Sequence, residues 1–190
     1  MASRSPRRRQ LLRQMGIHSR VLRPSPDEDA EPALSLCQDG IKPPELALAR
    51  ARNKVRTVKH RVRSGIIIGA DTVVALHGTI FGKPGNRDEA RQMLDKLSGR
   101  THEVTTALCL LVRPENREIV GVSTTKVKFR KLGPEEIESY TSTPEPYDKA
   151  GAYGIQGKAG VFVERIEGDY FNIVGLPIAL LHRLLRRSAT

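Results

Sequence analysis

The most β-branched run of the sequence, IIIGADTVV at residues 66–74, contains a carboxylate at Asp71. Such a run is typical of a strand buried on both faces, where an unpaired carboxylate would cost several kcal/mol. We therefore expect Asp71 to lie where the strand emerges from the sheet, at the edge where α/β proteins bind ligands. The alternative is an aspartate that only caps a turn at the end of a strand.

A second group of polar residues opens the chain. Ser5 is placed to cap a helix that has Pro6 at its first position. Arg7 and Arg8 follow in the first turn, where the helix dipole disfavours each cation by about 0.3–1 kcal/mol. Free amide groups at a helix start, a serine hydroxyl and guanidinium groups together suit a phosphate. The alternative is a basic N-terminal tail without a ligand.

Three further features could serve a phosphate or a metal. The acidic stretch PDEDAEP, which contains Glu28, is either a solvated loop or a source of oxygen ligands for a hard cation such as Mg²⁺. A helix expected over residues 44–63 carries an apolar stripe flanked by Lys54. The stretch KAGAYGIQGKAG at residues 149–160 is rich in glycine, which lets backbone amides approach a ligand, but it lacks the Walker A and Rossmann spacings.

Other catalytic and metal patterns are missing from the sequence. The five histidines have no metal-ligand spacing, and there is no GxSxG motif. Cys37 and Cys109 are far apart and form no CxxC pair, which favours a reducing cytoplasm.

The composition sets the class of protein. A chain of 190 residues can form one sizeable core, so we expect a single domain over residues 1–190. The sequence contains no apolar run long enough to cross a bilayer, and the N-terminus lacks the apolar stretch of a secretory signal. The formal net charge of +11 attracts phosphates, nucleic acids or acidic membranes. An aromatic content of 4% with no Trp argues against binding of single-stranded nucleic acid.

Alternating strands and helices must position these residues. The pair His77-Gly78 predicts a hairpin turn that returns Lys83 toward the Asp71 end of the sheet. The other expected elements are a helix after Asn86, strands over 102–112 and 119–130, a helix over 134–140, strand-like pieces around VFVERI and FNIVGLP, and a closing helix through LLHRLL. This pattern indicates a mixed α/β sheet.

Six motifs, in order, resemble those of the Maf family of nucleoside triphosphate pyrophosphatases: ASRSPRRRQLL, GADTVV, GKP, LSGRTHEVTT, DKAGAYGIQG and GDYFNIVGLP. The resemblance implies an α/β, inosine-triphosphatase-like fold, in which helices flank an elongated, twisted mixed β-sheet and the active-site cleft lies between two lobes. It also implies hydrolysis of a nucleoside triphosphate to the monophosphate and pyrophosphate with Mg²⁺ or Mn²⁺, in the cytoplasm, by a chain that is commonly a homodimer.

The resemblance also implies roles for the residues that match the motifs. These are Ser5, Arg7 and Arg8 on the phosphates, Lys54 and Lys83 as basic contacts to the triphosphate, Asp71 as the proton acceptor, and Glu28 as the acidic residue for the metal. Because Mg²⁺ is typically held by one or two carboxylates and substrate phosphates, Asp71 can instead be a metal ligand. The sequence does not separate these two roles.

Three positions resemble the subgroup of the family that acts on dTTP and UTP: Arg7, Thr72 and Gln156. The hydroxyl and amide groups of Thr72 and Gln156 can read a pyrimidine edge through hydrogen bonds. Thr72 directly follows Asp71, so on an extended strand the two side chains point to opposite faces and both line a cleft only if the strand bends.

Three alternatives stay open at this stage. The nucleotide could be another one, such as a methylated guanosine triphosphate. The chain could be a basic nucleic-acid-binding protein without turnover, or a catalytically silent Maf-like regulator that binds nucleotide.

Maf proteins usually begin with an apolar strand before the SPRR motif, whereas this sequence starts at Met1-Ala2-Ser3, so we expect a truncated or replaced first strand.

Overall fold

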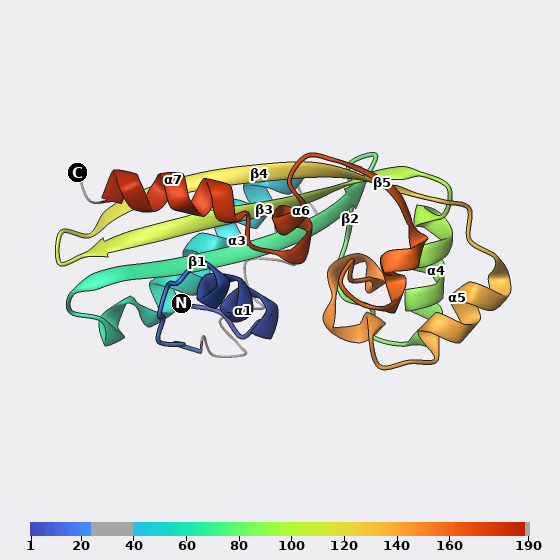
Figure 1. Ribbon diagram of the computed structural model, residues 1–190, viewed down its shortest axis with the longest axis horizontal. Helices are drawn as coiled ribbons and strands as arrows, with labels where there is room; N and C mark the ends of the chain where they lie inside the picture. The colour runs from blue at the N-terminus through green and yellow to red at the C-terminus, as the bar shows by residue number, and fades with distance from the viewer. Residues whose placement is uncertain (24–39, 189–190) are drawn as a thin grey trace.

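The computed structural model describes residues 1–23 and 40–188. Its centre is a five-stranded sheet in the order β2-β1-β3-β4-β5, and every pair of neighbouring strands is antiparallel. The strands are β1 (Gly65–Leu76), β2 (Thr79–Phe81), β3 (Thr101–Arg113), β4 (Arg117–Phe129) and β5 (Val163–Glu167). Figure 1 shows the three long strands running along the molecule, with a smaller helical lobe at one end.

The α-helices are α1 (Pro6–Gln14), α3 (Pro43–Val58), α4 (Arg87–Leu97), α5 (Pro134–Thr141), α6 (Tyr170–Val174) and α7 (Ile178–Ser188). Short 3-10 turns complete the fold: η1 (Lys59–Arg61), η2 (Pro146–Asp148), η3 (Ala150–Ala152) and η4 (Lys158–Phe162). The predicted caps are confirmed, since the Ser5 hydroxyl accepts from Arg8 N at 3.4 Å and the Asn86 side chain accepts from Glu89 N at 2.9 Å. The helix expected over residues 44–63 ends earlier, at Val58, and continues as η1.

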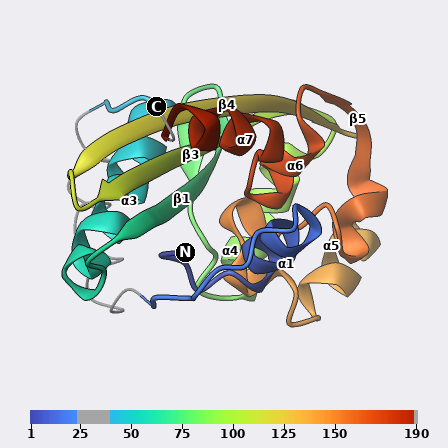
Figure 2. The same cartoon turned by 60° about the vertical axis from the view of Figure 1, so that its left-hand side comes forward.

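Helices bury both faces of β1, which explains its uninterrupted apolar run. Ile67 and Val73 pack with α3, whereas Ile68 and Ala70 face the opposite way and pack with α1, α6 and α7. Figure 2 shows α7 and α3 on opposite sides of the sheet. The α3 backbone approaches β1 so closely at Gly69 that a Cβ atom there would collide with the carbonyl oxygen of Ala51.

The N-terminal segment adds a parallel element to this otherwise antiparallel sheet. Ala2 forms isolated parallel bridges with Gly69 of β1 and with Leu22, and Ala2 N donates to Ile68 O at 2.8 Å. The five strands themselves pair only antiparallel, so parallel pairing among the described residues is limited to these isolated bridges. At the place where the sequence analysis expected a truncated or replaced first strand, the chain forms these single bridges.

Two expectations about local structure were wrong. Asp71 does not lie where its strand emerges: it is in the middle of β1, opposite Ala107 of β3. The segment FNIVGLP is not a strand, because the Asp169 side chain accepts from Phe171 N at 2.8 Å and starts the short helix α6. Within α6, the Asn172 amide donates to Val104 O at 2.8 Å, which fastens the helix to β3.

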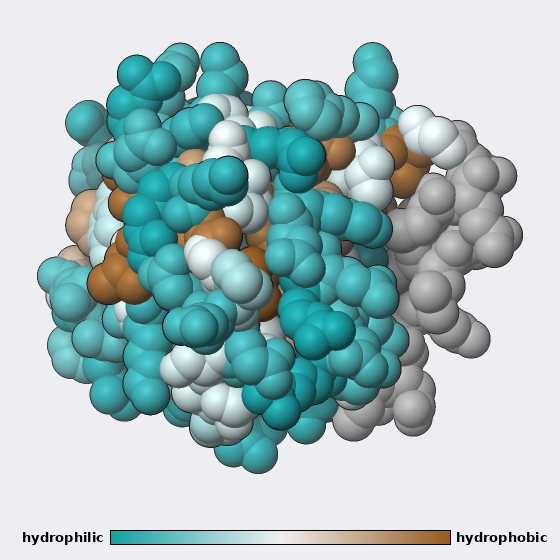
Figure 3. All heavy atoms as spheres, turned by 90° about the vertical axis from the view of Figure 1, so that its right-hand side faces the viewer, coloured by the Kyte–Doolittle hydropathy of each residue, from teal (hydrophilic) through white to brown (hydrophobic). Residues whose placement is uncertain are grey.

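The smaller lobe has its own core. Leu94 and Leu97 of α4, Ile137 of α5 and the aromatic side chains of Phe129 and Phe162 are buried together there. Figure 3 shows hydrophilic side chains over most of this end of the molecule, with hydrophobic residues in small groups between them. Among the described residues, no helix is long and apolar enough to span a membrane. The single-domain expectation stays a prediction.

Candidate active site

A cavity of about 740 Å³ lies between the sheet and the smaller lobe. All the predicted site residues that the structure describes line it: Ser5, Arg7, Arg8, Lys54, Asp71, Thr72, Lys83 and Gln156. The hairpin between β1 and β2 brings Lys83 to the same cavity as Asp71, as its turn predicts. Glu28, the predicted metal residue, lies outside the described residues.

A gap in the edge of the sheet exposes both Asp71 and Thr72 to the cavity. On the edge of β1 that faces away from β3, Ala2 pairs at Gly69 and β2 begins pairing only at Val74. Between these two points the described chain places no strand beside β1. A cavity at this edge reaches both faces of the strand, so no bend of the strand is needed for Asp71 and Thr72 to line it.

Two cations from α3 compensate the buried carboxylate of Asp71. Lys54 Nζ is 2.7 Å from Asp71 Oδ1, and Arg50 Nη1 is 3.8 Å from Oδ2. The Asp71 side chain is only 11% exposed, so these partners offset the cost of burying its charge. The sequence analysis missed Arg50, although its spacing of four residues from Lys54 places both on one face of the helix.

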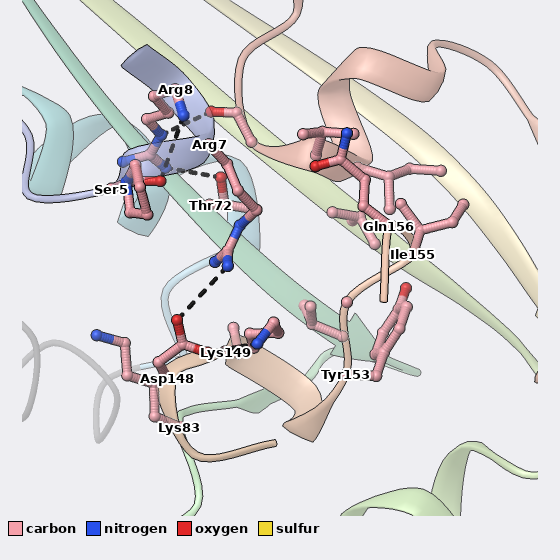
Figure 4. A pocket seen from close by; sticks show the side chains of 18 of the residues that line it. Ser5, Arg7, Arg8, Thr72, Lys83, Asp148, Lys149, Tyr153, Ile155 and Gln156 are labelled. Carbon is pink, nitrogen blue, oxygen red and sulfur yellow. Dashed lines mark hydrogen bonds and ion pairs between the residues drawn. The ribbon is translucent and has the colours of Figure 1, made fainter. Parts of the chain in front are cut away.

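Neighbouring arginines of α1 have different surroundings. The Arg8 side chain is buried and donates from Nε to Gly175 O at 2.7 Å, from Nη1 to Ala70 O at 2.8 Å and from Nη2 to Thr72 Oγ1 at 2.9 Å. Arg8 therefore joins α1 to β1 and to the turn after α6. Arg7 instead points into the cavity, where its guanidinium lies 3.5 Å from Asp148 (Figure 4).

The Thr72 hydroxyl is also held by protein groups. Its Oγ1 accepts from Arg8 and lies 2.9 Å from Thr106 Oγ1 on β3. Thr72 thereby fixes the guanidinium of Arg8, whereas its predicted contact with a base stays a prediction.

The smaller lobe contributes residues that the sequence analysis did not assign. Asp148 lies between Arg7 and Lys149, whose ammonium group donates to it at 2.5 Å. Burial raises the pKa of Asp148, but the contacts with Lys149 and Arg7 outweigh this effect and hold the pKa below its usual value. Both residues stand in the DKAGAYGIQG motif, which was the available signal for them.

Positive charge predominates around the cavity. Six cationic side chains line it, namely Arg4, Arg7, Arg8, Lys54, Lys83 and Lys149, against three carboxylates, Asp71, Glu145 and Asp148. A concave surface of this charge attracts anions and suits a polyphosphate.

One atom of the site fits a divalent cation. Asp71 Oδ2 is buried and accepts no hydrogen bond from the described residues, its neighbour being the guanidinium of Arg50 at 3.8 Å, and carboxylate oxygens are ligands that Mg²⁺ and Mn²⁺ prefer. Within residues 1–23 and 40–188, no group of three His, Cys, Asp or Glu side chains is arranged to hold a metal.

Comparison with known proteins identifies the family. The model of the family described as "Maf-like protein" matches residues 1–188. The chain belongs to the Maf family. The family predicted from the six motifs is thus confirmed, and with it the fold class.

Similar proteins match almost the whole length of this chain. A protein of Carboxydothermus hydrogenoformans is 47% identical over 98% of this chain and 96% of its own length. One from Dictyoglomus thermophilum is 47% identical over 98% and 94%, and one from Thermococcus gammatolerans is 49% identical over 97% and 93%. Each of the three is named dTTP/UTP pyrophosphatase.

Proposed function

We propose that this Maf protein hydrolyses dTTP and UTP to the nucleoside monophosphate and pyrophosphate. The observation that carries the proposal is the buried Asp71 carboxylate at the sheet edge, facing a cavity lined by six cationic side chains. The names of relatives that share almost half of its residues favour the same reaction and the same nucleotides.

The reaction needs charge neutralised on the phosphates and a water molecule deprotonated and aimed. Water adds to phosphorus, the bond between the α and β phosphoryl groups breaks, and the leaving oxygen departs with pyrophosphate. In our proposal Ser5, Arg7 and Lys83 contact the phosphates, whereas Arg8 and Lys54, which the sequence also assigned to the phosphates, hold Thr72 and Asp71 in place. Lys54 Nζ donates to Oδ1 of Asp71 and Arg50 Nη1 lies 3.8 Å from Oδ2, so both cations hold the carboxylate that takes the proton from water or binds a metal ion.

A divalent cation, Mg²⁺ or Mn²⁺, is part of this proposal. When bound, it would neutralise phosphate charge, with Asp71 as a protein ligand beside the substrate phosphates. Glu28 is proposed as a second acidic ligand. We further propose that the chain works in the cytoplasm as a homodimer.

Base selection is assigned to Gln156, whose side chain is exposed and lines the cavity. Its amide offers both a donor and an acceptor, which matches the edge of uracil or thymine. We expect Gln156→Ala to narrow the preference for dTTP and UTP over ATP by about fivefold to tenfold, because one side chain that recognises the base is lost. The fall in kcat for dTTP and UTP should be smaller than this.

Pyrophosphate release from a panel of nucleotides tests the proposal. We expect dTTP and UTP to be cleaved well above ATP, GTP, CTP and a methylated guanosine triphosphate, and activity to require added Mg²⁺ or Mn²⁺. A profile led by the methylated nucleotide would instead favour the other Maf subgroup. Absence of turnover, together with nucleic-acid affinity that falls steeply with salt, would favour the polyanion-binding alternative that the net charge of +11 suggests.

A further inference from the structure

Gln156 occupies the tip of a tight turn in the wall of the cavity. Gly157 N donates to Gly154 O at 3.0 Å, so residues 154–157 form a β-turn with Ile155 and Gln156 at its centre. Both central residues line the cavity (Figure 4). A side chain at such a tip is held in place only as firmly as the two ends of its turn.

A buried hydrogen bond anchors the end that precedes the turn. The Tyr153 hydroxyl lies 2.8 Å from His102 Nε2, and the two residues are only 5% and 1% exposed. Phe129 packs edge-on against both rings, at centroid distances of 4.9 Å from His102 and 4.8 Å from Tyr153. Burial lowers the pKa of His102 to about 4, so the imidazole is neutral near pH 7 and has one donor and one acceptor nitrogen.

A carboxylate holds the end that follows the turn. Glu145 Oε2 accepts from Lys158 N at 3.0 Å, and Glu145 Oε1 accepts from the Tyr140 hydroxyl at 3.2 Å. The carboxylate packs directly against Gly157, where a Cβ atom would collide with it. The turn therefore has a support at each end, one of them fastened to the central sheet through β3.

We propose that the His102–Tyr153 hydrogen bond positions the Gln156 turn and thereby sets the selectivity for the base. The proposal rests on the proposed function, since that function assigns base recognition to Gln156. His102 lies outside the cavity lining formed by the described residues and acts only through Tyr153, so it is a positioning residue. It stands on β3, and its bond to Tyr153 transmits the rigidity of the sheet to the loop.

The physical reason is that hydrogen bonds discriminate between bases only when the protein group is fixed. An amide held in one place leaves a mismatched base with unpaired polar groups, whereas an amide on a mobile turn can adapt to several bases. Loss of the anchor should therefore raise KM for dTTP and UTP and leave kcat almost unchanged. The residues proposed for chemistry, Asp71 and Lys54, belong to β1 and α3 and not to the turn.

The central test compares Tyr153→Phe with Tyr147→Phe. The first variant removes only the hydroxyl that meets His102. The control removes a hydroxyl that donates to Thr141 O at 2.7 Å in the same lobe, from a residue outside the lining of the cavity. We expect the ratio of kcat/KM for dTTP to that for ATP to fall about fivefold in Tyr153→Phe, through KM, and by less than about twofold in the control.

Two substitutions of His102 keep the test decisive if Tyr153→Phe folds poorly. His102→Gln retains a polar group for the Tyr153 hydroxyl and should keep most of the selectivity for dTTP over ATP. His102→Leu should lose about as much of this selectivity as Tyr153→Phe does. Wild-type selectivity in His102→Leu or Tyr153→Phe, or an equal loss in Tyr147→Phe, would overturn the positioning role. If the unmodified protein shows no preference for dTTP and UTP, the proposed function itself is refuted.

Discussion

The cavity has two walls that are built differently. One, which we call the sheet wall, consists of Arg8, Lys54, Asp71 and Thr72, whose side chains are buried or half-buried and bonded to one another or to the backbone of the core. The other, the loop wall, consists of Glu145, Asp148, Lys149 and Gln156, which stand on short turns and include exposed side chains.

This difference indicates a division of tasks. Groups that move protons must keep one geometry, and Asp71, which we propose for this role, is fixed in the sheet wall by contacts that also stabilise the fold. Groups that select a substrate can stand on a loop, provided that the loop is supported from behind. Substitutions in the sheet wall should therefore affect turnover or stability strongly, and substitutions in the loop wall should mainly affect substrate choice.

The largest effect is expected for Asp71→Asn. The change is nearly isosteric but removes the proposed proton acceptor or metal ligand, so kcat should fall about 10²–10⁴-fold with the fold retained. Steady-state assays and circular dichroism on purified protein measure both quantities. Asp148→Asn is the matched change in the loop wall. An equal loss of kcat in Asp148→Asn would contradict the division of tasks between the two walls.

The next largest effect concerns stability. Arg8→Ala leaves the buried carbonyl groups of Ala70 and Gly175 without a side-chain donor, and should lower the free energy of unfolding by about 2–4 kcal/mol. Urea denaturation at 25 °C measures this change. If Arg8→Ala unfolds at the same urea concentration as the wild type, the sheet wall does not stabilise the fold.

A pH dependence tests the support behind the loop wall. The pKa of His102 is about 4 in the folded chain against 6.5 for an ordinary histidine, so the unfolded chain binds the extra proton between these values. The free energy of unfolding is therefore unaffected by His102 above pH 6.5 and falls as the pH is lowered toward 4 and below, by about 3 kcal/mol in total. Denaturant unfolding of the wild type and of His102→Leu at several pH values measures this loss. An identical pH dependence of the free energy of unfolding in the two proteins would contradict the lowered pKa of His102.

The smallest change in stability is expected for Arg7→Ala. Its ion pair with Asp148 joins side chains that are 31% and 62% exposed, and such pairs contribute about 0–1 kcal/mol. Removing a cation from the first turn of α1 also relieves an unfavourable interaction with the helix dipole. We therefore expect unchanged or slightly higher stability, with kcat/KM for dTTP reduced about tenfold. A clear fall in melting temperature with full activity would show that Arg7 is structural.

Much of the fold follows from signals that act over a few residues. The caps at Ser5 and Asn86 predict where α1 and α4 begin, and the His77-Gly78 pair predicts the hairpin that carries Lys83. These signals work because a cap or a turn is complete within its own segment. The ordered motifs predict the family, which the family match confirms.

Other features depended on contacts between distant segments. Alternation along β1 predicts that Asp71 and Thr72 point apart, but only the pairing of Ala2 with Gly69 and the late start of β2 open the edge at which both meet the cavity. In the same way, the arginines of α1 look equivalent in the sequence. The tertiary structure alone directs Arg8 to Ala70 and Gly175 and Arg7 to Asp148, because the acceptors for each side chain come from parts of the chain far away in sequence.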